Sequence, residues 1–474
     1  MTKKPGWIRK EDRKKILLLS DDMRMTSGVG VMSKEIVIKT AHHYNWVQLA
    51  AAVKHPEQGK LLDMSDAVNK ETGLDDSLVR LYPCTGYGNQ EGLRYLLMNE
   101  KPDAILHFTD PRFWIWLYQM EHEIREHLPI FFYHIWDDTP YPKYNENFYR
   151  SCDWIGCISK QTYNIVKQVW QKGGKDNVED WRISYVPHGI DPNVFRPLDS
   201  KSEKKDILEW RKKLLGNDEV DFIIFWNNRN IRRKMPGDLI LAFQYFLKQL
   251  PKEKANRCRM VLHTQPVDEN GTDLPVIIRD IAPECKIIFS VERLTPQYLN
   301  MLYNLADVTI NIASNEGFGI GTLESMAAET PIIVNVTGGL QDQCGFMTKA
   351  GVYLDPDEHF NFDFGTNADK KYTKHGDWVL PVWPAQRGLI GSPQTPYIFD
   401  DRCDWKDVGM QLLKFYNMSP AERKRRGMLG REYAIKEGYT SEGMAQCFID
   451  GMDRVFEKWD GGCRPPRHTL IKAV

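Results

Sequence analysis

Two glutamates stand eight residues apart around a glycine-rich stretch, and this spacing is the most specific chemical signal in the sequence. Glu316 precedes the stretch and Glu324 follows it, within SNEGFGIGTLESMAAET (314–330). A carboxylate accepts hydrogen bonds from neighbouring hydroxyl groups, and glycines let backbone N–H groups approach a ligand closely. The pattern predicts a site for a polyhydroxylated ligand, at which Gly317, Gly319 and Gly321 let backbone amides point toward it. The alternative is a pair of exposed acids in a glycine-rich turn.

A second segment, FWNNRNIRRKMPGD (225–238), concentrates positive charge. Its four cations fall within six residues: Arg229, Arg232, Arg233 and Lys234. They follow an apolar run and precede Pro236, where we expect a helix to begin. Arginine binds phosphate oxygens in pairs and lysine adds a point charge, so this cluster suits a diphosphate. The alternative is a solvated basic loop, and the sequence does not decide which cations touch phosphate.

Gly28 and Gly30 lie in SDDMRMTSGVGVMSK (20–34), between an expected strand and an expected helix. A helix N-terminus with small residues lets backbone amides meet an anion. Position 33 is Ser, so the segment does not match the GxGxxG dinucleotide pattern. A simple turn that needs small residues is the alternative.

His134 ends an expected strand in IFFYHIWDDTP (130–140), with Asp137 and Asp138 close behind it. The end of a strand is where a parallel sheet places its functional residues, so these side chains are candidates for the site. A single histidine at a strand end is more often structural, and that alternative stays open.

These segments need a scaffold that brings the ends of several strands together. Short apolar runs alternate with amphipathic stretches of helical length, which is typical of parallel sheets covered on both faces. The series pauses at a proline- and charge-rich stretch, 187–206, and then restarts. We therefore predict two successive doubly wound α/β domains facing across a cleft. The expected strands are 14–20, 46–53, 103–108, 129–136, 154–159 and 182–187, then 221–228, 258–264, 286–290, 308–314 and 331–336.

Helices are expected between these strands and in the C-terminal tail. In the tail, Ser419 followed by Pro420 predicts a helix start, and Glu422 stands at capping-box spacing from Ser419. The helical ranges between strands are 31–43, 91–100, 112–127, 161–172, 236–250, 295–306 and 321–329, and those of the tail are 404–417, 419–438 and 440–459.

Composition sets limits on the function. The 474 residues carry 63 Lys and Arg against 64 Asp and Glu, which argues against a dedicated nucleic-acid-binding surface but allows a local basic patch. No run approaches the roughly 18 apolar residues of a membrane-spanning helix. The first 15 residues are too polar for a signal peptide. Nine scattered cysteines without a CxxC pattern indicate reduced thiols rather than a zinc site. We expect a cytoplasmic protein.

Taken in order, the segments resemble one known family. EGFGIGTLE followed by SMAAETPIIV resembles the signature of retaining GT-B glycosyltransferases of the family-4 type, the glycosyl transferases group 1. PHGIDPNVFRP, NNRNIRRK, LTPQYLNMLYNLADVTINIAS and PIFFYHIWDD resemble other segments of that family in the same order. The resemblance covers about residues 15–345 and resumes at about 398–459. It implies an acceptor-side domain at 1–198, a nucleotide-sugar domain at 199–440, and a final segment, 441–474, that packs back on the first domain.

The resemblance also implies a role for each candidate residue. Arg229, Arg233 and Lys234 would bind the pyrophosphate of a nucleoside-diphosphate sugar, and Arg229 and Lys234 would neutralise its charge as it leaves. Glu324 would hold the ribose hydroxyls, and Glu316 with the amides of residues 317–319 would hold the donor sugar. Gly28 and Gly30 would approach the diphosphate, and His134 would contact the sugar near the reacting carbon. The catalytic set is thus Arg229, Lys234, Glu316 and His134.

The implied reaction moves a sugar to a hydroxyl acceptor and keeps its anomeric configuration. It needs no protein nucleophile, no metal and no cofactor besides the nucleotide sugar, and Asp355-Pro-Asp357 is read as a loop. A glycan or glycolipid head group is the family's usual acceptor. A modified base in DNA is a less favoured alternative. A nucleotide-sugar epimerase, a phosphorylase-type enzyme and a non-catalytic sugar-nucleotide-binding protein also remain open, and the sequence says nothing about the oligomeric state.

One stretch departs from the family pattern. About 40 extra residues, 357–396, separate GVYLDP from the closing helices. They include the large aromatic residues Phe360, Phe362, Phe364, Trp378 and Trp383. Loops of this length are usually functional or disordered. We expect this insertion either to shape the acceptor side or to form an oligomer contact.

Overall fold

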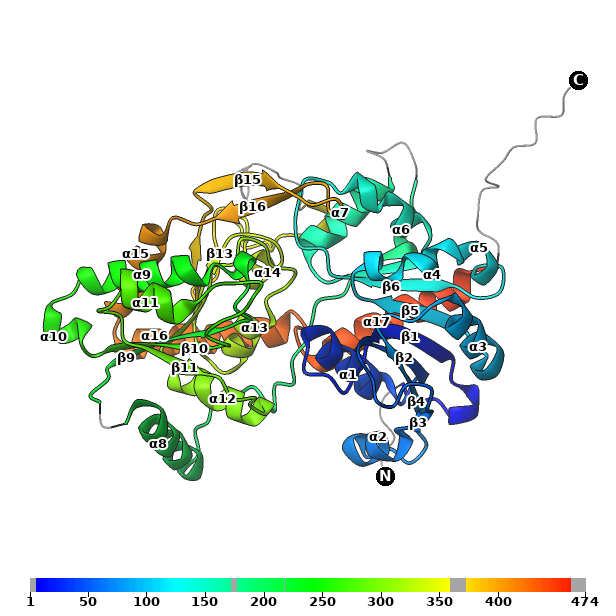
Figure 1. Cartoon of the computed structure of the whole chain (residues 1–474), viewed down its shortest axis with the longest axis horizontal. Helices are drawn as coiled ribbons and strands as arrows, with labels where there is room; N and C mark the ends of the chain where they lie inside the picture. The colour runs from blue at the N-terminus through cyan, green and yellow to red at the C-terminus, as the bar shows by residue number, and fades with distance from the viewer. Residues whose placement is uncertain (1–5, 172–176, 217, 359–371, 462–474) are drawn as a thin grey trace, which may run out of the picture.

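The computed structural model describes residues 6–171, 177–216, 218–358 and 372–461. It has two lobes, each built on an open sheet with helices on both faces (Figure 1). The first lobe contains the sheet of strands β1 to β8, and the second lobe contains the sheet of strands β9 to β14.

The first sheet has the strand order β3-β4-β2-β1-β5-β6-β7-β8, and all neighbouring strands run parallel except β3 and β4. Parallel strands place their carboxyl ends at one edge of the sheet, so the loops that follow them share that edge. The strands are β1 (Lys15–Asp21), β2 (Asn45–Val53), β3 (Leu62–Asp63), β4 (Val79–Thr85), β5 (Ala104–Phe108), β6 (Ile130–His134), β7 (Trp154–Cys157) and β8 (Ile183–Tyr185).

Both faces of this sheet are apolar because successive side chains of a strand point to opposite faces. In β1, Ile16 and Leu18 join one core, whereas Leu17 and Leu19 join the other. The first face is covered by α1 (Gly28–Thr40), α2 (Ser65–Thr72) and α17 (Ser441–Lys458). The second face is covered by α3 (Gln90–Glu100), α4 (Ile115–Gln119), α5 (Glu121–Ile124), α6 (Glu146–Arg150) and α7 (Lys160–Trp170).

The second sheet is wholly parallel, with the order β11-β10-β9-β12-β13-β14. Its strands are β9 (Phe222–Asn227), β10 (Cys258–His263), β11 (Ile287–Ser290), β12 (Val308–Asn311), β13 (Ile332–Asn335) and β14 (Val379–Val382). One face is covered by α9 (Pro236–Lys248), α11 (Leu274–Ile281) and α15 (Trp405–Tyr416), and the other by α12 (Pro296–Leu305), α13 (Ile320–Ala327) and α16 (Pro420–Lys436). The remaining elements are α8 (Lys201–Leu215), α10 (Lys252–Ala255), α14 (Leu340–Gln343) and a hairpin of β15 (Gln386–Ile390) and β16 (Ile398–Arg402).

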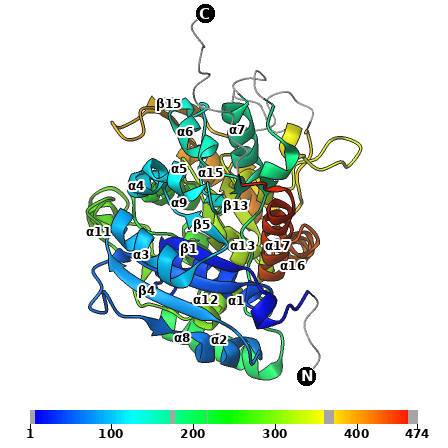
Figure 2. The same cartoon turned by 90° about the vertical axis from the view of Figure 1, so that its right-hand side faces the viewer.

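The chain crosses between the lobes twice, and the two crossings lie side by side. Ile190 accepts a hydrogen bond at 2.9 Å from the amide of Ser441, and its own amide donates to Tyr439 at 3.3 Å. The second crossing takes the tail from α16 in the second lobe to α17 in the first (Figure 1). Figure 2, which looks onto the first lobe, shows α16 and α17 next to each other at one side of the molecule.

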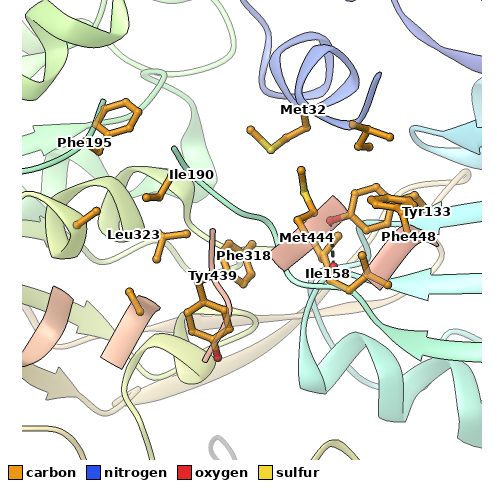
Figure 3. Close-up of a cluster of buried hydrophobic side chains, with 14 of the residues drawn as sticks. Met32, Tyr133, Ile158, Ile190, Phe195, Phe318, Leu323, Tyr439, Met444 and Phe448 are labelled. Carbon is orange, nitrogen blue, oxygen red and sulfur yellow. Dashed lines mark hydrogen bonds between the residues drawn. The ribbon is translucent and has the colours of Figure 1, made fainter. Parts of the chain in front are cut away.

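The helix α17 completes the core of the first lobe. Its Phe448 lies with its ring centroid 4.8 Å from that of Tyr133. The same core continues into the second lobe, where Phe318 and Tyr439 pack between the crossings (Figure 3). The two lobes therefore share apolar contacts at the level of the crossings, in addition to the polar contacts described below.

Several local expectations differ from the structure. α1 begins at Gly28 instead of position 31, because Ser27 caps it by accepting from the amide of Gly30 at 3.1 Å. The stretch 112–127 is broken into a 3-10 turn (Pro111–Trp114) and the short helices α4 and α5. Ser419 does cap α16, but the carboxylate of Glu422 pairs with Arg425 and Arg426 and so does not complete a capping box.

Candidate functional site

The glycine-rich segment forms the turn between β12 and α13. Gly319 has φ 87° and stands immediately before α13, a conformation that glycine adopts without strain. Gly317 lies at the contact with the first lobe, because a Cβ there would meet the Ile135 carbonyl oxygen at 3.1 Å. The side chain of Phe318 is buried in the shared core, so only its backbone is left to face a ligand.

Glu316 and Lys234 form a buried ion pair and hydrogen bond at this turn. Both residues are less than a tenth exposed. Arg233 approaches the same carboxylate at 3.8 Å and donates to the carbonyl oxygen of Asn315 at 2.7 Å. Burial alone would raise the pKa of Glu316, but Lys234 and Arg233 outweigh it and lower that pKa. The basic loop and the acidic turn, 82 residues apart in sequence, thus meet at one point.

Arg229 is placed differently from its neighbours in the basic loop. Its side chain is 63% exposed and pairs with Asp268 at 2.8 Å. The structure therefore separates the predicted cluster into a buried lysine with its adjacent arginine and a peripheral arginine held by a carboxylate.

Glu324 lies in α13, one turn beyond the glycine-rich segment. Tyr303 donates a hydrogen bond to its carboxylate at 2.6 Å, and Asn227 at the end of β9 donates to the same tyrosine hydroxyl at 2.9 Å. Burial raises the pKa of Glu324 to about 7, and the hydrogen bond from Tyr303 opposes that shift. A carboxylate with such a pKa changes its charge near neutral pH.

Gly28 and Gly30 both lie in the first turn of α1. A Cβ at Gly30 would meet the carbonyl oxygen of Asp22 at 2.8 Å, so glycine is needed for close packing of the preceding loop. Gly28 has no heavy atom within 4 Å of such a Cβ position, which leaves the helix end open. A helix of this length presents its first amides to an anion.

The structure does not bring His134 to the Lys234–Glu316 pair. His134 is 1% exposed, and its Nε2 lies 2.8 Å from the hydroxyl of Tyr149 in α6. The reason is strand alternation, since His134 points to the same face of β6 as Phe132, which belongs to the core under α3 to α7. Burial lowers its pKa far below the usual range, so it stays neutral.

Asp137, three residues beyond His134, is the first-lobe residue that reaches the ion pair. Its carboxylate is close enough to Arg233, Lys234 and Glu316 for their charges to act on it. Burial raises its pKa, and Arg233 opposes that shift. Gly338 shows how close the lobes are, because a Cβ there would lie 2.0 Å from the carbonyl oxygen of Glu316 and 2.9 Å from that of Asp137.

His188 also lies beside the site, and sequence reasoning missed it. It belongs to the segment between the lobes, PHGIDPNVFRP, and its Nδ1 lies 2.8 Å from the hydroxyl of Tyr133. Its ring is 5.6 Å from that of Phe318. Burial lowers the pKa of His188 to about 4, against the opposing effect of Glu316, so its ring is neutral at pH 7. The motif pointed to this segment in the sequence, but only the fold shows that His188 lies beside the acidic turn.

An aromatic surface lies at the ends of β4 and β5. Tyr87 and Phe113 stack with centroids 4.7 Å apart and planes 5° apart, and Phe113 is 52% exposed. Burial, together with the charges of Asp21 and Asp110, raises the pKa of Tyr87 to about 12. Asp21 is buried, and its Oδ1 has no hydrogen-bond partner among the described residues. Stacked exposed rings beside carboxylates can hold a sugar ring, through its C–H face and its hydroxyls.

The arginines that border this surface are already paired. Arg24 lies 2.7 Å from Asp22 and 2.9 Å from Glu57. Arg112 lies 2.6 Å from Asp110 and stacks over Trp136. Because carboxylates outnumber these guanidinium groups, the surface does not favour a polyphosphate ligand.

The insertion at 357–396 is described only in part. Phe360, Phe362 and Phe364 lie outside the described residues. Trp378 is buried, stacks on Tyr433 with centroids 4.4 Å apart and immediately precedes the edge strand β14. Trp383 is 39% exposed and packs beside Phe346, after which the chain enters the β15–β16 hairpin.

A cavity of about 610 Å³ lies elsewhere, against β14, α15 and α16. Its lining includes Trp383, His375, Lys414 and Arg426, and contains none of the predicted site residues. Volume alone does not connect this cavity with the chemistry of the Lys234–Glu316 pair.

Residues 206–359 match the family of glycosyl transferases group 1. The chain is similar to the D-inositol 3-phosphate glycosyltransferase of Stackebrandtia nassauensis, with 30% identity over 162 residues. That match covers 34% of each chain, so the chain spans about a third of the length of the curated relative. The family match, residues 206–359, contains the basic loop and both glutamates.

Two solved structures resemble the whole described fold. The Anabaena HepE structure, in complex with UDP and glucose, superposes with a TM-score of 0.62 and 13% identity, covering 93% of this chain and all of that one. Sucrose-phosphate synthase of Thermosynechococcus elongatus gives a TM-score of 0.63 and 14% identity, covering 94% of this chain and all of that one. The fold is GT-B, two Rossmann-like lobes with C-terminal helices. Within the described ranges, no helix is both long and apolar enough to cross a membrane.

Proposed function

We propose that the protein is a retaining glycosyltransferase that moves a sugar from a nucleoside diphosphate to a hydroxyl acceptor. The observation that carries this proposal is the buried Lys234–Glu316 pair at the junction of the lobes, with Arg233 beside it. A cation for a diphosphate and a carboxylate for sugar hydroxyls stand there side by side. The group 1 match over residues 206–359 supports the same assignment.

In this proposal Lys234 and Arg233 bind the diphosphate, and Lys234 gains most as negative charge develops on the leaving group. Glu316 and the amides of the glycine-rich turn hold the donor sugar, and Glu324 holds the ribose hydroxyls. Arg229 would have to leave Asp268 to reach the diphosphate, so we assign it a peripheral part. Since protein cations neutralise the leaving group, we expect activity to persist in a chelator of divalent metals.

The proposed reaction breaks the bond between the anomeric carbon and the diphosphate oxygen, and forms a bond from the acceptor oxygen on the same face of the sugar. The acceptor proton passes to the departing phosphate oxygen, so no protein nucleophile takes part. We assign His134 no contact with the sugar, because its ring lies on the face of β6 away from the ion pair and binds Tyr149. Asp137 and His188 lie close enough to feel the charge of Glu316, so we assign them the part of orienting the sugar.

For the acceptor we favour a neutral glycan or a glycolipid head group over a base in DNA. The Tyr87–Phe113 stack offers a surface for a sugar ring, and Asp21 and Asp110 beside it would repel a phosphate backbone. Transfer to a small glycan should therefore depend little on salt. A steep loss of activity with added salt, on a DNA acceptor, would reverse this choice.

A donor screen tests the proposal directly. Thermal melting in the presence of each common nucleoside diphosphate should show one that raises the midpoint, because a ligand at 100 times its Kd stabilises by about 2.7 kcal/mol. Product analysis with the matching labelled sugar donor should then show a glycosylated acceptor with the anomeric configuration of the donor. Stabilisation by none of the nucleoside diphosphates, or a product of inverted configuration, would refute the proposal.

A further inference from the structure

The hairpin of β15 and β16 is fixed to the second lobe at its base. Arg402 binds Asp238 at the start of α9 through two hydrogen bonds of 2.6 and 2.7 Å. The amide of Asp401 donates to the carbonyl oxygen of Ser314 at 3.1 Å, and Asn335 donates to the carbonyl oxygen of Asp401 at 2.8 Å. The hairpin base is thus tied to the segment that runs directly into Glu316.

The other part of the hairpin is bound to the first lobe. The amide of Phe399 donates to the carbonyl oxygen of Thr139 at 2.7 Å. The hydroxyl of Tyr144 donates to the carbonyl oxygen of Tyr397 at 2.7 Å, and the hydroxyl of Tyr397 donates to the backbone carbonyl oxygen of Tyr141 at 3.1 Å. These first-lobe partners all lie in the segment between β6 and α6, which also contains the site residue Asp137. In Figure 1 the hairpin lies above the second sheet and reaches toward α7.

Asn315 is where the hairpin, the first lobe and the donor site meet. Its side-chain amide donates to the carbonyl oxygen of Phe399 at 2.5 Å and to Asp138 Oδ2 at 2.8 Å. Its own carbonyl oxygen accepts from Arg233 at 2.7 Å. One amide hydrogen is donated to the hairpin and the other to the first lobe, so the side chain makes both hydrogen bonds in a single orientation. Its chain neighbour is Glu316.

A buried polar network extends this junction into the hairpin. Arg387 in β15 binds Asp401 in β16 through hydrogen bonds of 2.6 and 2.9 Å. The hydroxyl of Thr337 lies 3.1 Å from Asp401 Oδ2 and 3.5 Å from Asp138 Oδ2. Because an unpaired buried carboxylate is costly, loss of Arg387 would disturb both aspartates.

We propose that the hairpin is a brace across the two lobes, which positions Glu316 for the donor sugar through Asn315. Asn315, Asp401 and Arg387 are positioning residues in this arrangement. The inference rests on the proposed function, since it assigns the hairpin a part in the same donor site. It also explains why the hairpin follows β14, the edge strand of the second sheet, and yet is bound by the first lobe.

Asn315→Ala removes both side-chain hydrogen bonds and should let the Glu316 turn move. Displacement of a positioning group by about 1 Å can lower turnover by about 100-fold. The Kd of the sugar-free nucleoside diphosphate should change less than about threefold, because Glu324 and Lys234 are retained. Leu389→Ala is the matched control in the same hairpin, since Leu389 is 64% exposed, and its turnover should equal that of the parent. Equal losses in turnover and diphosphate affinity, or no loss of turnover, would overturn the inference.

Arg387→Met tests the brace from a position remote from the donor, in case Asn315→Ala does not fold. Its turnover should also fall with the diphosphate Kd preserved, and Arg387→Lys should restore part of it by keeping the charge beside Asp401. If neither variant differs from the parent, the brace has no part in positioning.

Hydrogen exchange separates this inference from the proposed function. In both Asn315→Ala and Arg387→Met, the amides of Phe399 and Asp401 should exchange at least tenfold faster, whereas those of β12 should not change. A parent protein that transfers no sugar refutes the proposed function and leaves this readout valid. Unchanged exchange at both amides refutes the brace, whatever the activity of the parent.

Discussion

At the scale of single residues, the central feature is that the opposite charges of Lys234 and Glu316 pair in a site that is shielded from water. A buried lysine or glutamate alone would carry a large desolvation penalty, and each group of the pair offsets part of the penalty of the other. Under the proposed function, a donor diphosphate would give Lys234 a second anion, and donor hydroxyls would give Glu316 new hydrogen-bond donors. The pair would then be a preformed site in which ligand groups replace part of an existing interaction.

Lys234→Ala should lower turnover by about 100- to 1000-fold, because its contact strengthens as charge develops on the leaving phosphate. The donor KM should change much less. Steady-state kinetics on the purified variant measures both parameters. Lys248→Ala, at the exposed end of the following helix, is the control and should behave like the parent.

Glu324→Ala should act on binding instead. Loss of a carboxylate that accepts two ribose hydroxyls costs about 3 kcal/mol, which raises the donor KM by roughly 100-fold while turnover is largely kept. Small and equal effects of the alanine variants at 234 and 324 would contradict both assignments.

The pH dependence of donor binding should follow Glu324, whose pKa burial raises to about 7. Only the ionised form accepts both hydroxyls, so affinity should rise with pH up to about 7 and then level off. Below that pH, affinity should fall by about tenfold per unit. Calorimetric Kd values between pH 5 and 8 test this, and Glu324→Gln should flatten the profile. A parent profile no steeper than that of Glu324→Gln would show that another group titrates.

At the scale of elements, continuous apolar runs predicted the core strands of both sheets well. The strand β4 was not predicted because Pro83 interrupts its apolar run. The helix α8 was not predicted because a mostly charged helix shows little apolar periodicity. The acidic turn and the basic loop could each be singled out in the sequence because each is a short local motif. The position of His134 depends on which face of β6 it occupies, and Asn315 and Asp137 depend on how the lobes meet, which no local pattern records. The domain limits and the residue roles taken from the sequence stay predictions.

The contact between α16 and the end of α13 gives a test at this scale. A Cβ at Gly427 would lie 1.8 Å from the carbonyl oxygen of Glu329. Gly427→Ala should therefore push the two helices apart and lower stability by about 1–3 kcal/mol. Thermal or denaturant unfolding measures the change. Gly388→Ala, where a Cβ meets no heavy atom within 4 Å, should leave the midpoint unchanged. Equal midpoints for the two variants would show that the helix contact is loose.

At the scale of the whole molecule, polar contacts hold the lobes together beyond the crossings. Asp342 in α14 accepts from the amide of Lys160 at 2.9 Å and from the hydroxyl of Tyr185 at 3.0 Å, both in the first lobe. Gln341 donates to Gln161 at 2.7 Å in the same region. Together with the hairpin, these contacts connect the lobes on the side of β6, β7 and α7.

Gly189→Ala tests the paired crossings. A Cβ there would lie 2.0 Å from the carbonyl oxygen of Thr440, so the two segments would have to separate. We expect a loss of about 1–3 kcal/mol in unfolding free energy, together with lower turnover, because the lobes would no longer meet in register. Denaturant unfolding and steady-state kinetics, measured on one preparation of the variant and one of the parent, provide the comparison. An unchanged midpoint with unchanged turnover would show that the crossings tolerate separation.

The position of α17 has a consequence for how the protein is made. Phe448 and Met452 belong to the same core as β1 and β6, yet they are synthesised more than 300 residues later. On the ribosome, the first lobe must emerge with the part of this face that α17 covers still exposed, until the end of the chain is made. Nascent chains arrested before residue 441 should therefore recruit chaperones at that face, and release should follow once the last helix clears the exit tunnel.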